Sequence, residues 1–243
     1  MIKIKTEYVD DVQKLAVGIE TNIIYEFAKN CIIPINEKYP DSGDDTIKLV
    51  YNFKNEQRAL IVREYKPDNI QDEGCKRADI LSFVFDDKRN KCLTYILDMK
   101  RNITGFDDSE NIDSLRKGVI SRIKDFIYQL EDTRLTKNSL IAYYEGYEQI
   151  EFFGIITRSF KENRIDILIN KLKDILNINT NINKLLIAKV SITRLSIEKE
   201  IDMLEMFKNK QIILSNKKYE LHVILLEKCT SSSNYFCDLH INI

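Results

Sequence analysis

Histidine is scarce in this chain, and its scarcity disfavours several enzyme classes. The only two histidines, His222 and His240, fall in the C-terminal part, and neither stands in a recognisable motif. Ser-His-Asp and Cys-His enzymes need an imidazole in the site, so both are disfavoured. The seven glycines form neither a G-x-x-x-x-G-K-[ST] loop nor a G-x-G-x-x-G turn, which disfavours nucleotide hydrolysis and dinucleotide chemistry. Chemistry by carboxylates and a metal ion is what remains.

Cysteines and long apolar runs are also few. The five cysteines are an odd set without a C-x-x-C pair, which favours reduced thiols over a disulfide framework. The spacing of Cys229, Cys237 and His240 matches no common zinc site, and we interpret these residues as structural. No run approaches the roughly 18 apolar residues of a membrane helix, and residues 1–7 lack the features of a secretion signal. We therefore expect a cytoplasmic protein that does not enter a membrane.

Charge of one sign does not dominate the chain. The net charge is −1, from 37 Lys and Arg against 38 Asp and Glu. Residues 1–157 hold 23 basic and 28 acidic residues (−5), and residues 158–243 hold 14 and 10 (+4). A protein that holds nucleic acid by electrostatics alone carries a stronger positive bias. If the ligand is nucleic acid, we expect a protein partner subunit to contribute much of the nucleic-acid binding.

The most informative feature is a predicted β-hairpin. Residues 78–85 and 93–100 are rich in β-branched and aromatic side chains, and a polar cluster separates them. A four-residue loop over 87–90 places Asp79 opposite Asp98. Like charges facing each other on neighbouring strands are destabilising, and a divalent cation with oxygen ligands would compensate. Lys100 projects on the same side of the strand as Asp98 because side chains alternate with period two.

Asp79 followed by Asp98-Met99-Lys100 resembles the PD-(D/E)XK superfamily, the restriction-endonuclease-like phosphodiesterases. Members often have proline before the first acid, where this chain has Ala78. The resemblance implies an α/β fold whose core runs helix, three strands, helix and strand, with a mixed sheet flanked by helices. We expect residues 1–160 to form this core and residues 161–243 to form a C-terminal α/β extension or small lobe.

Apolar periodicity places elements along this order. Helical spacing predicts a helix over 11–31 and another from Ser114 to about Leu130. Strands are expected on both sides of the second helix, at 46–53, 59–65 and 152–157. The C-terminal part is expected to form a helix over 161–177, a strand over 185–192, a helix over 196–208, a strand over 219–226 and an irregular tail beyond Cys229.

The resemblance also implies a metal site. Asp79, Asp98, the backbone carbonyl of Met99 and Glu20 would hold Mg²⁺ or Mn²⁺, and Lys100 would orient or deprotonate the attacking water. Glu20 falls on the inner face of the first predicted helix, and the alternative is that it is a rim residue or a partner for Lys100. For Lys100 the alternative is a structural salt bridge to Asp98.

Two further residues are candidates for positioning the substrate. Gln129 lies late in the second predicted helix, where some branches of the superfamily carry a glutamine beside the metal. The alternative is a solvent-facing glutamine. Arg101 belongs to a set of basic residues around the hairpin that would contact phosphates, the alternative being solvated surface charges. The rest of this set is Lys76, Arg77, Lys88, Arg89, Lys91 and Lys100.

The function expected from these residues is a Mg²⁺- or Mn²⁺-dependent deoxyribonuclease. RNA stays open as an alternative substrate. By analogy, a small nuclease-like chain without helicase motifs is similar to nuclease subunits of bacterial anti-phage defence or restriction systems. Two other classes stay open, a catalytically silent nuclease-fold subunit that binds or scaffolds a larger complex, and an interaction module with an ordinary hairpin.

Overall fold

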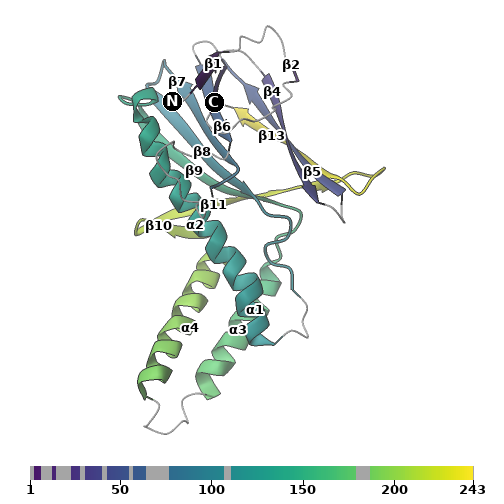
Figure 1. Ribbon diagram of the computed structural model, residues 1–243, viewed down its shortest axis with the longest axis vertical. Coiled ribbons are helices and arrows are strands. Elements are labelled where there is room, and N and C mark those ends of the chain that lie inside the picture. Colours follow the sequence, from purple (N-terminus) through teal and green to yellow (C-terminus); the bar gives the residue numbers. More distant parts are fainter. Residues whose placement is uncertain are drawn as a thin grey trace. The chain divides into compact units, whose positions relative to one another are not determined.

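The computed structural model describes residues 3–6, 13–14, 23–27, 31–39, 43–54, 57–63, 77–106, 111–178 and 187–242 (Figure 1). The chain divides into two compact units. Unit 1 consists of Met1–Arg101, Tyr128–Arg158 and His222–Ile243, and unit 2 of Asn102–Ile127 and Ser159–Leu221. The boundary expected between residues 160 and 161 falls within unit 2, which the chain enters twice.

A large mixed sheet forms the centre of unit 1. Its strands lie in the order β1 (Lys3–Thr6), β3 (Ile23–Phe27), β6 (Gln57–Arg63), β7 (Ile80–Asp86), β8 (Lys91–Met99), β9 (Glu148–Thr157) and β11 (Lys217–Leu225). The first residues of β11 belong to unit 2, where they pair with β10 (Gln211–Leu214). Strands β6, β7 and β8 form an antiparallel meander, and β9 runs parallel to β8. The parallel pairing requires a long crossover connection, which contains a helix.

A second mixed sheet belongs to unit 1 as well. Its order is β12 (Glu227–Lys228), β13 (Tyr235–Asn242), β5 (Gly43–Asn52), β4 (Cys31–Tyr39) and β2 (Gln13–Lys14). Strand β13, from the C-terminal end of the chain, runs parallel to β5 from its N-terminal part. The two ends of the sequence therefore build one sheet together.

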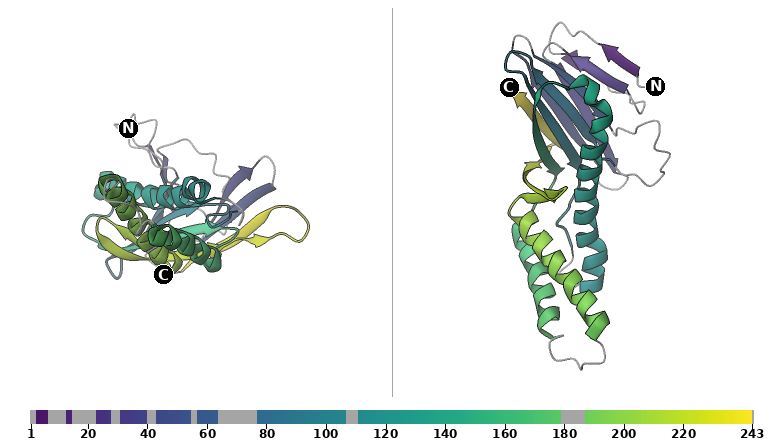
Figure 2. Two further views of the ribbon diagram at one scale, coloured as in Figure 1. Left: turned by 90° about the horizontal axis from the view of Figure 1, so that it is seen from below. Right: turned by 90° about the vertical axis from the view of Figure 1, so that its left-hand side faces the viewer.

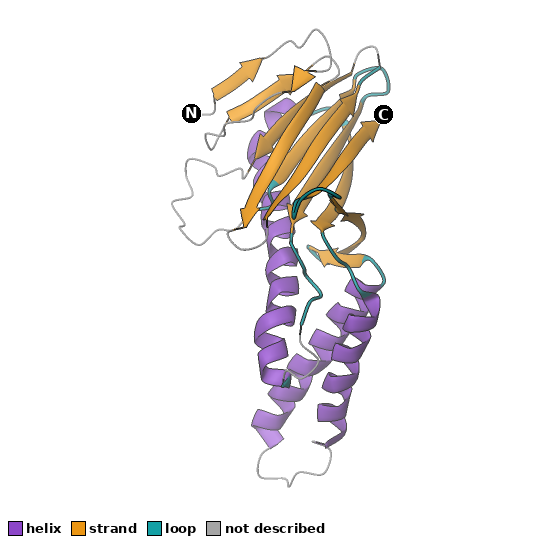
Figure 3. Cartoon of the chain, turned by 90° about the vertical axis from the view of Figure 1, so that its right-hand side faces the viewer, coloured by secondary structure: helices purple, strands orange, loops and turns teal. Residues whose placement is uncertain are grey.

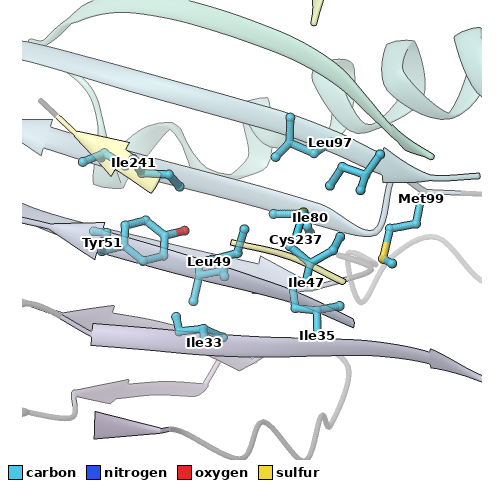
Figure 4. Packing of buried hydrophobic residues seen from close by; sticks show 14 of the residues in the cluster. Ile33, Ile35, Ile47, Leu49, Tyr51, Ile80, Leu97, Met99, Cys237 and Ile241 are labelled. Atoms are coloured by element: carbon cyan, nitrogen blue, oxygen red, sulfur yellow. The ribbon is translucent and has the colours of Figure 1, made fainter. Parts of the chain in front are cut away.

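The two sheets enclose an apolar core (Figure 4). Every second residue of β5 is buried, so Ile47, Leu49 and Tyr51 point into this core. Leu97 and Met99 reach it from β8. Burial of each large aliphatic side chain contributes about 1.5–3 kcal/mol. The Tyr51 hydroxyl lies 2.7 Å from the Ser82 hydroxyl, so the one polar tip of this tyrosine is satisfied inside the core.

The opposite face of the large sheet is covered by helical structure. The residues of helix α2 (Ser121–Thr136) that belong to unit 1, and the following 3-10 helix (Lys137–Tyr143), lie against it (Figure 2). Phe83 of β7 stacks on Tyr144 with ring centroids 5.3 Å apart. Strand β7 is buried at every position because both of its faces are covered.

Unit 2 is mainly helical (Figure 3). It contains α1 (Ile112–Leu115), a π-helical turn (Arg116–Ile120), the start of α2, α3 (Glu162–Ile178) and α4 (Ile187–Lys208). Phe126 and Phe160 both contact the Phe207 ring, with centroids 6.0 and 5.4 Å away. Buried Glu200 of α4 accepts hydrogen bonds from Arg116 and Lys124, so charged groups also hold these helices together.

Several sequence predictions are confirmed. The chain is mixed α/β, and the hairpin has the predicted four-residue turn and the predicted register, with Phe85 opposite Cys92 and Asp86 opposite Lys91. The structure also contains the strands expected near 46–53, 59–65, 152–157 and 219–226 and the helices expected near 114–130, 161–177 and 196–208.

Other predictions are wrong. The helix expected over 11–31 is wrong where the structure describes this range: residues 13–14 belong to β2, and residues 23–27 form β3, because their run of β-branched and aromatic side chains pairs with β1 and β6. Residues 11–12, 15–22 and 28–30 lie outside the described residues. Residues 187–192 are helical, since a short apolar run does not distinguish a strand from a buried helix. The tail is not irregular, because residues 235–242 form strand β13. The second sheet, which covers one face of the large sheet, was not expected from the sequence.

Candidate functional site

The hairpin brings Asp79 and Asp98 together at one end of β7 and β8. Ile80 pairs with Leu97, so the next pair outward is Asp79 and Asp98. The Met99 backbone N–H donates a hydrogen bond of 2.6 Å to Asp79 Oδ2, which fixes the first carboxylate over the second strand. Leu97 and Met99 point into the core between the sheets, so Asp98 points to the opposite face, toward α2.

Asp98 is an unusual carboxyl group because it is fully buried. Burial, followed by the negative charge of Asp79, raises the pKa of Asp98 well above its usual value, and Lys100 offsets only part of this. Lys100 Nζ lies 2.5 Å from Asp98 Oδ2. The Asp79 side chain lies within hydrogen-bonding range of the Asp98 carboxyl. The metal-free site therefore favours a proton on Asp98, and a bound cation would have to take its place.

The position of Lys100 is compatible with both of its expected roles, the ion pair with Asp98 and action on the attacking water. Its backbone N–H donates 2.8 Å to the Ile156 carbonyl, which extends the parallel pairing of β8 with β9 by one residue. Its side chain is 26% exposed, while its ammonium contacts Asp98. The ammonium can thus pair with the buried acid and still face a ligand arriving from solvent.

The donor set fits part of a Mg²⁺ or Mn²⁺ site. Asp79 and Asp98 present carboxylate oxygens from neighbouring strands, which suits hard divalent cations. Glu20, the third acid implied by the resemblance, lies outside the described residues. Within the part of the chain that the structure describes, no group of three or more His, Cys, Asp and Glu side chains is arranged to hold a metal ion. The described acids therefore account for a pair of ligands.

Helix α2 is tied to the chain just before Asp79 by two contacts that sequence reasoning missed. Thr133 Oγ1 accepts a 2.8 Å hydrogen bond from the Ala78 backbone N–H. Next to it, the buried side chain of Arg77 forms an ion pair with the partly exposed Asp132. We call these two contacts the α2 latch. Arg77 was expected among the phosphate-binding residues, but this buried arginine already has an anionic partner within the protein.

Gln129 lies one helical turn before Thr133 on α2. Its backbone carbonyl accepts a 2.8 Å hydrogen bond from the Thr133 hydroxyl. Its side-chain Oε1 is buried and has no hydrogen-bond partner among the described residues. Gln129 is therefore on the helix face that meets the start of β7, and its role in positioning a substrate stays a prediction.

The basic residues of the hairpin separate into two groups. Lys88 and Arg89 occupy the turn and Lys91 begins β8, about 24 Å from Asp98 at roughly 3.4 Å per residue. Arg101 is exposed and directly follows Lys100, and its carbonyl accepts a 3.1 Å hydrogen bond from the Arg158 N–H. Of the expected set within the described chain, Lys100 contacts the acid pair, and Arg101 is its exposed neighbour in sequence.

Comparisons with known proteins do not identify a family for this chain. The chain matches no protein-family model, no curated protein and no solved structure. Among the helices that the structure describes, none has the length and apolar character needed to cross a membrane. The acid pair and Lys100, with the elements that hold them, are therefore the features of the chain that bear on its function.

Proposed function

We propose that this chain is a Mg²⁺- or Mn²⁺-dependent nuclease that hydrolyses DNA phosphodiester bonds. The observation that carries the proposal is that the Asp79 and Asp98 side chains lie close together at the ends of neighbouring strands, with the Lys100 ammonium in contact with Asp98. The order of β6, β7 and β8, followed by α2 and by β9 parallel to β8, supports it, since this is the later part of the core that the PD-(D/E)XK resemblance implies.

The residues would divide the work as follows. Asp79 and Asp98 would hold the metal ion, with the Met99 carbonyl and Glu20 as further ligands by resemblance. When bound, such a metal ion lowers the pKa of water and stabilises negative charge on phosphoryl oxygens. Lys100 would orient or deprotonate the attacking water and stabilise developing charge, and Arg101 and Gln129 would position the nucleic acid. The Met99 N–H keeps Asp79 in place for this role.

The biological context that we propose is a subunit of a bacterial anti-phage defence or restriction system. The balanced charge of the chain supports a protein partner that contributes to DNA binding. The alternative is a catalytically silent nuclease-fold subunit. It is favoured by one observation, that Asp98 is fully buried and already paired with Lys100.

Metal-dependent cleavage is the first prediction. The purified chain, alone and with the products of neighbouring genes, should cut plasmid, linear or single-stranded DNA with Mg²⁺ or Mn²⁺ and not with EDTA. An RNA substrate in the same series decides between the two nucleic acids. Asp79→Asn should remove the activity. Metal-dependent DNA binding without any cleavage would instead support the silent subunit.

The metal-free chain should become more stable when Asp98 is made permanently neutral. The folded-state pKa of Asp98 is raised, chiefly by burial and then by Asp79, so the native state holds a proton that the unfolded state releases. Stability from this group is present below the unfolded pKa of about 3.9 and is lost as pH rises toward the folded pKa. Asp98→Asn should therefore raise the free energy of unfolding and the Tm of the metal-free chain near pH 8.

Thermal unfolding of wild type and Asp98→Asn at about pH 4 and about pH 8, without metal, checks this expectation. The difference should be small at the lower pH, where the native wild-type carboxyl is also neutral. A variant less stable than wild type at the higher pH would mean that the ion pair with Lys100 outweighs burial and repulsion by Asp79.

A further inference from the structure

We infer that the Thr133 hydroxyl is a positioning group for Asp79 and acts through the backbone of Ala78. As a statement about metal binding and cleavage, the inference rests on the proposed function. As a statement about where the Asp79 carboxylate is held, it depends only on contacts within unit 1.

The hydroxyl of Thr133 is an oriented acceptor. Thr133 is 1% exposed, and its hydroxyl donates its proton to the Gln129 carbonyl, 2.8 Å away. This bond to the preceding helical turn fixes the side-chain rotamer and turns the oxygen lone pairs outward from the helix. The Ala78 N–H meets that oxygen at 2.8 Å. A threonine late in α2 thereby holds a backbone amide 55 positions earlier in the sequence.

Asp79 depends on this contact because it lies before the regular strand. The paired residues of β7 begin at Ile80, so the antiparallel ladder does not include Asp79. Ala78 is held by Thr133 on one side, and the Asp79 carboxylate is held by the Met99 N–H on the other. Without the hydroxyl, the backbone before Asp79 keeps only the Arg77–Asp132 contact with α2, and the Asp79 carboxylate is held less firmly opposite Asp98.

Such support matters for a site made of ligands from two strands. A constellation of ligands has to be held within about 0.5 Å of its working geometry. Groups that orient the ligands of a metal ion typically change metal affinity or activity by about 10- to 100-fold. We therefore expect loss of the hydroxyl to weaken the site without removing any group that touches metal or substrate.

Hydrogen exchange of two neighbouring amides tests the positioning step in the chain without metal. The Met99 amide bonds to the Asp79 carboxylate, whereas the Lys100 amide bonds to the Ile156 carbonyl in the β8–β9 pairing. Thr133→Val should speed exchange at Met99 by about tenfold, the effect of losing one ordinary hydrogen bond, and leave Lys100 unchanged. Thr133→Ala gives a second variant without the hydroxyl in case valine prevents folding.

Mn²⁺ affinity and cleavage rate test the functional step. Thr133→Val and Thr133→Ala should each lower both about 10- to 100-fold, and Thr133→Ser, which keeps the hydroxyl, should stay close to wild type. Thr94→Val is the matched control, a buried threonine on β8 whose hydroxyl contacts Cys92 Sγ at 3.9 Å, and it should change neither quantity.

The outcomes separate this inference from the proposed function. If wild type binds and cuts but the hydroxyl-free variants equal it, the inference is overturned and the nuclease proposal stands. If wild type neither binds Mn²⁺ nor cuts DNA, the proposed function is wrong. The inferred effect of Thr133 on metal binding and cleavage is then wrong as well. If serine fails to rescue, or Met99 and Lys100 exchange faster together, Thr133 has a structural role only and the inference is again overturned.

Discussion

Lys100→Met is expected to slow metal-dependent DNA cleavage by about 10²- to 10⁴-fold, the usual contribution of a positioned proton donor or acceptor. The substitution keeps the aliphatic stem and removes the ammonium, which lies 2.5 Å from Asp98 and is the cation in contact with the buried acid. Single-turnover cleavage at saturating Mg²⁺ or Mn²⁺ measures the effect on the chemical step, separately from metal affinity.

Two companion variants separate chemistry from metal binding. Lys100→Arg keeps a positive charge beside Asp98, so metal binding should survive in that variant even if cleavage falls. Lys91→Met is the matched control, because Lys91 lies on the same strand but pairs with exposed Glu148 at the far end. It should cut at the wild-type rate. Cleavage by Lys100→Met at the wild-type rate would leave Lys100 as a structural salt bridge.

The sequence predicts those parts of the site whose geometry is set by neighbouring residues. Period-two alternation and a four-residue polar turn are sufficient to pair Asp79 with Asp98, and the register from Ile80 to Asp86 agrees. Asp-x-Lys on one strand then places Lys100 beside Asp98, as the contact between them shows. Each of these steps depends on neighbours in sequence or across one tight turn.

Long-range pairing is where sequence reasoning failed. Strand β13 lies parallel to β5 although nearly the whole chain separates them, and no local pattern names such a partner. Its alternation of buried Cys237 and Ile241 with exposed residues was present in the sequence, but the preceding serine-rich loop obscured it. Residues 23–27 show a related failure, since their apolar spacing fits a helix, whereas pairing with β6 makes them a strand.

The role of Arg77 could not be predicted for the same reason. A basic residue two positions before a proposed metal ligand reads as a phosphate contact when only its neighbours are known. Its partner, Asp132, comes from α2, and nothing in the local sequence around either residue identifies the pair. Helical periodicity places Asp132 and Thr133 one turn beyond Gln129, but it does not name Arg77 or Ala78 as their partners.

Arg77→Ala is expected to destabilise the protein by about 3–5 kcal/mol, the cost of removing one partner from a buried ion pair. The Arg77 side chain is 1% exposed, so alanine leaves a cavity and leaves the Asp132 carboxylate without its cation. Unfolding in urea, followed by circular dichroism, measures the change in the free energy of unfolding. The urea concentration at the midpoint should fall while the m-value stays constant.

Arg89 is a control that separates the effect of burial on stability from the effect of charge. Arg89 also pairs with an acid, Asp86, but its side chain is 65% exposed, so Arg89→Ala should cost no more than about 1 kcal/mol. Replacing both partners of the buried pair, as Arg77→Met with Asp132→Leu, should recover much of the loss, because two apolar groups leave no unpaired charge. If Arg77→Ala costs as little as Arg89→Ala, the Arg77–Asp132 pair does not hold the start of β7, and the Thr133–Ala78 hydrogen bond is then the contact with α2 that does so.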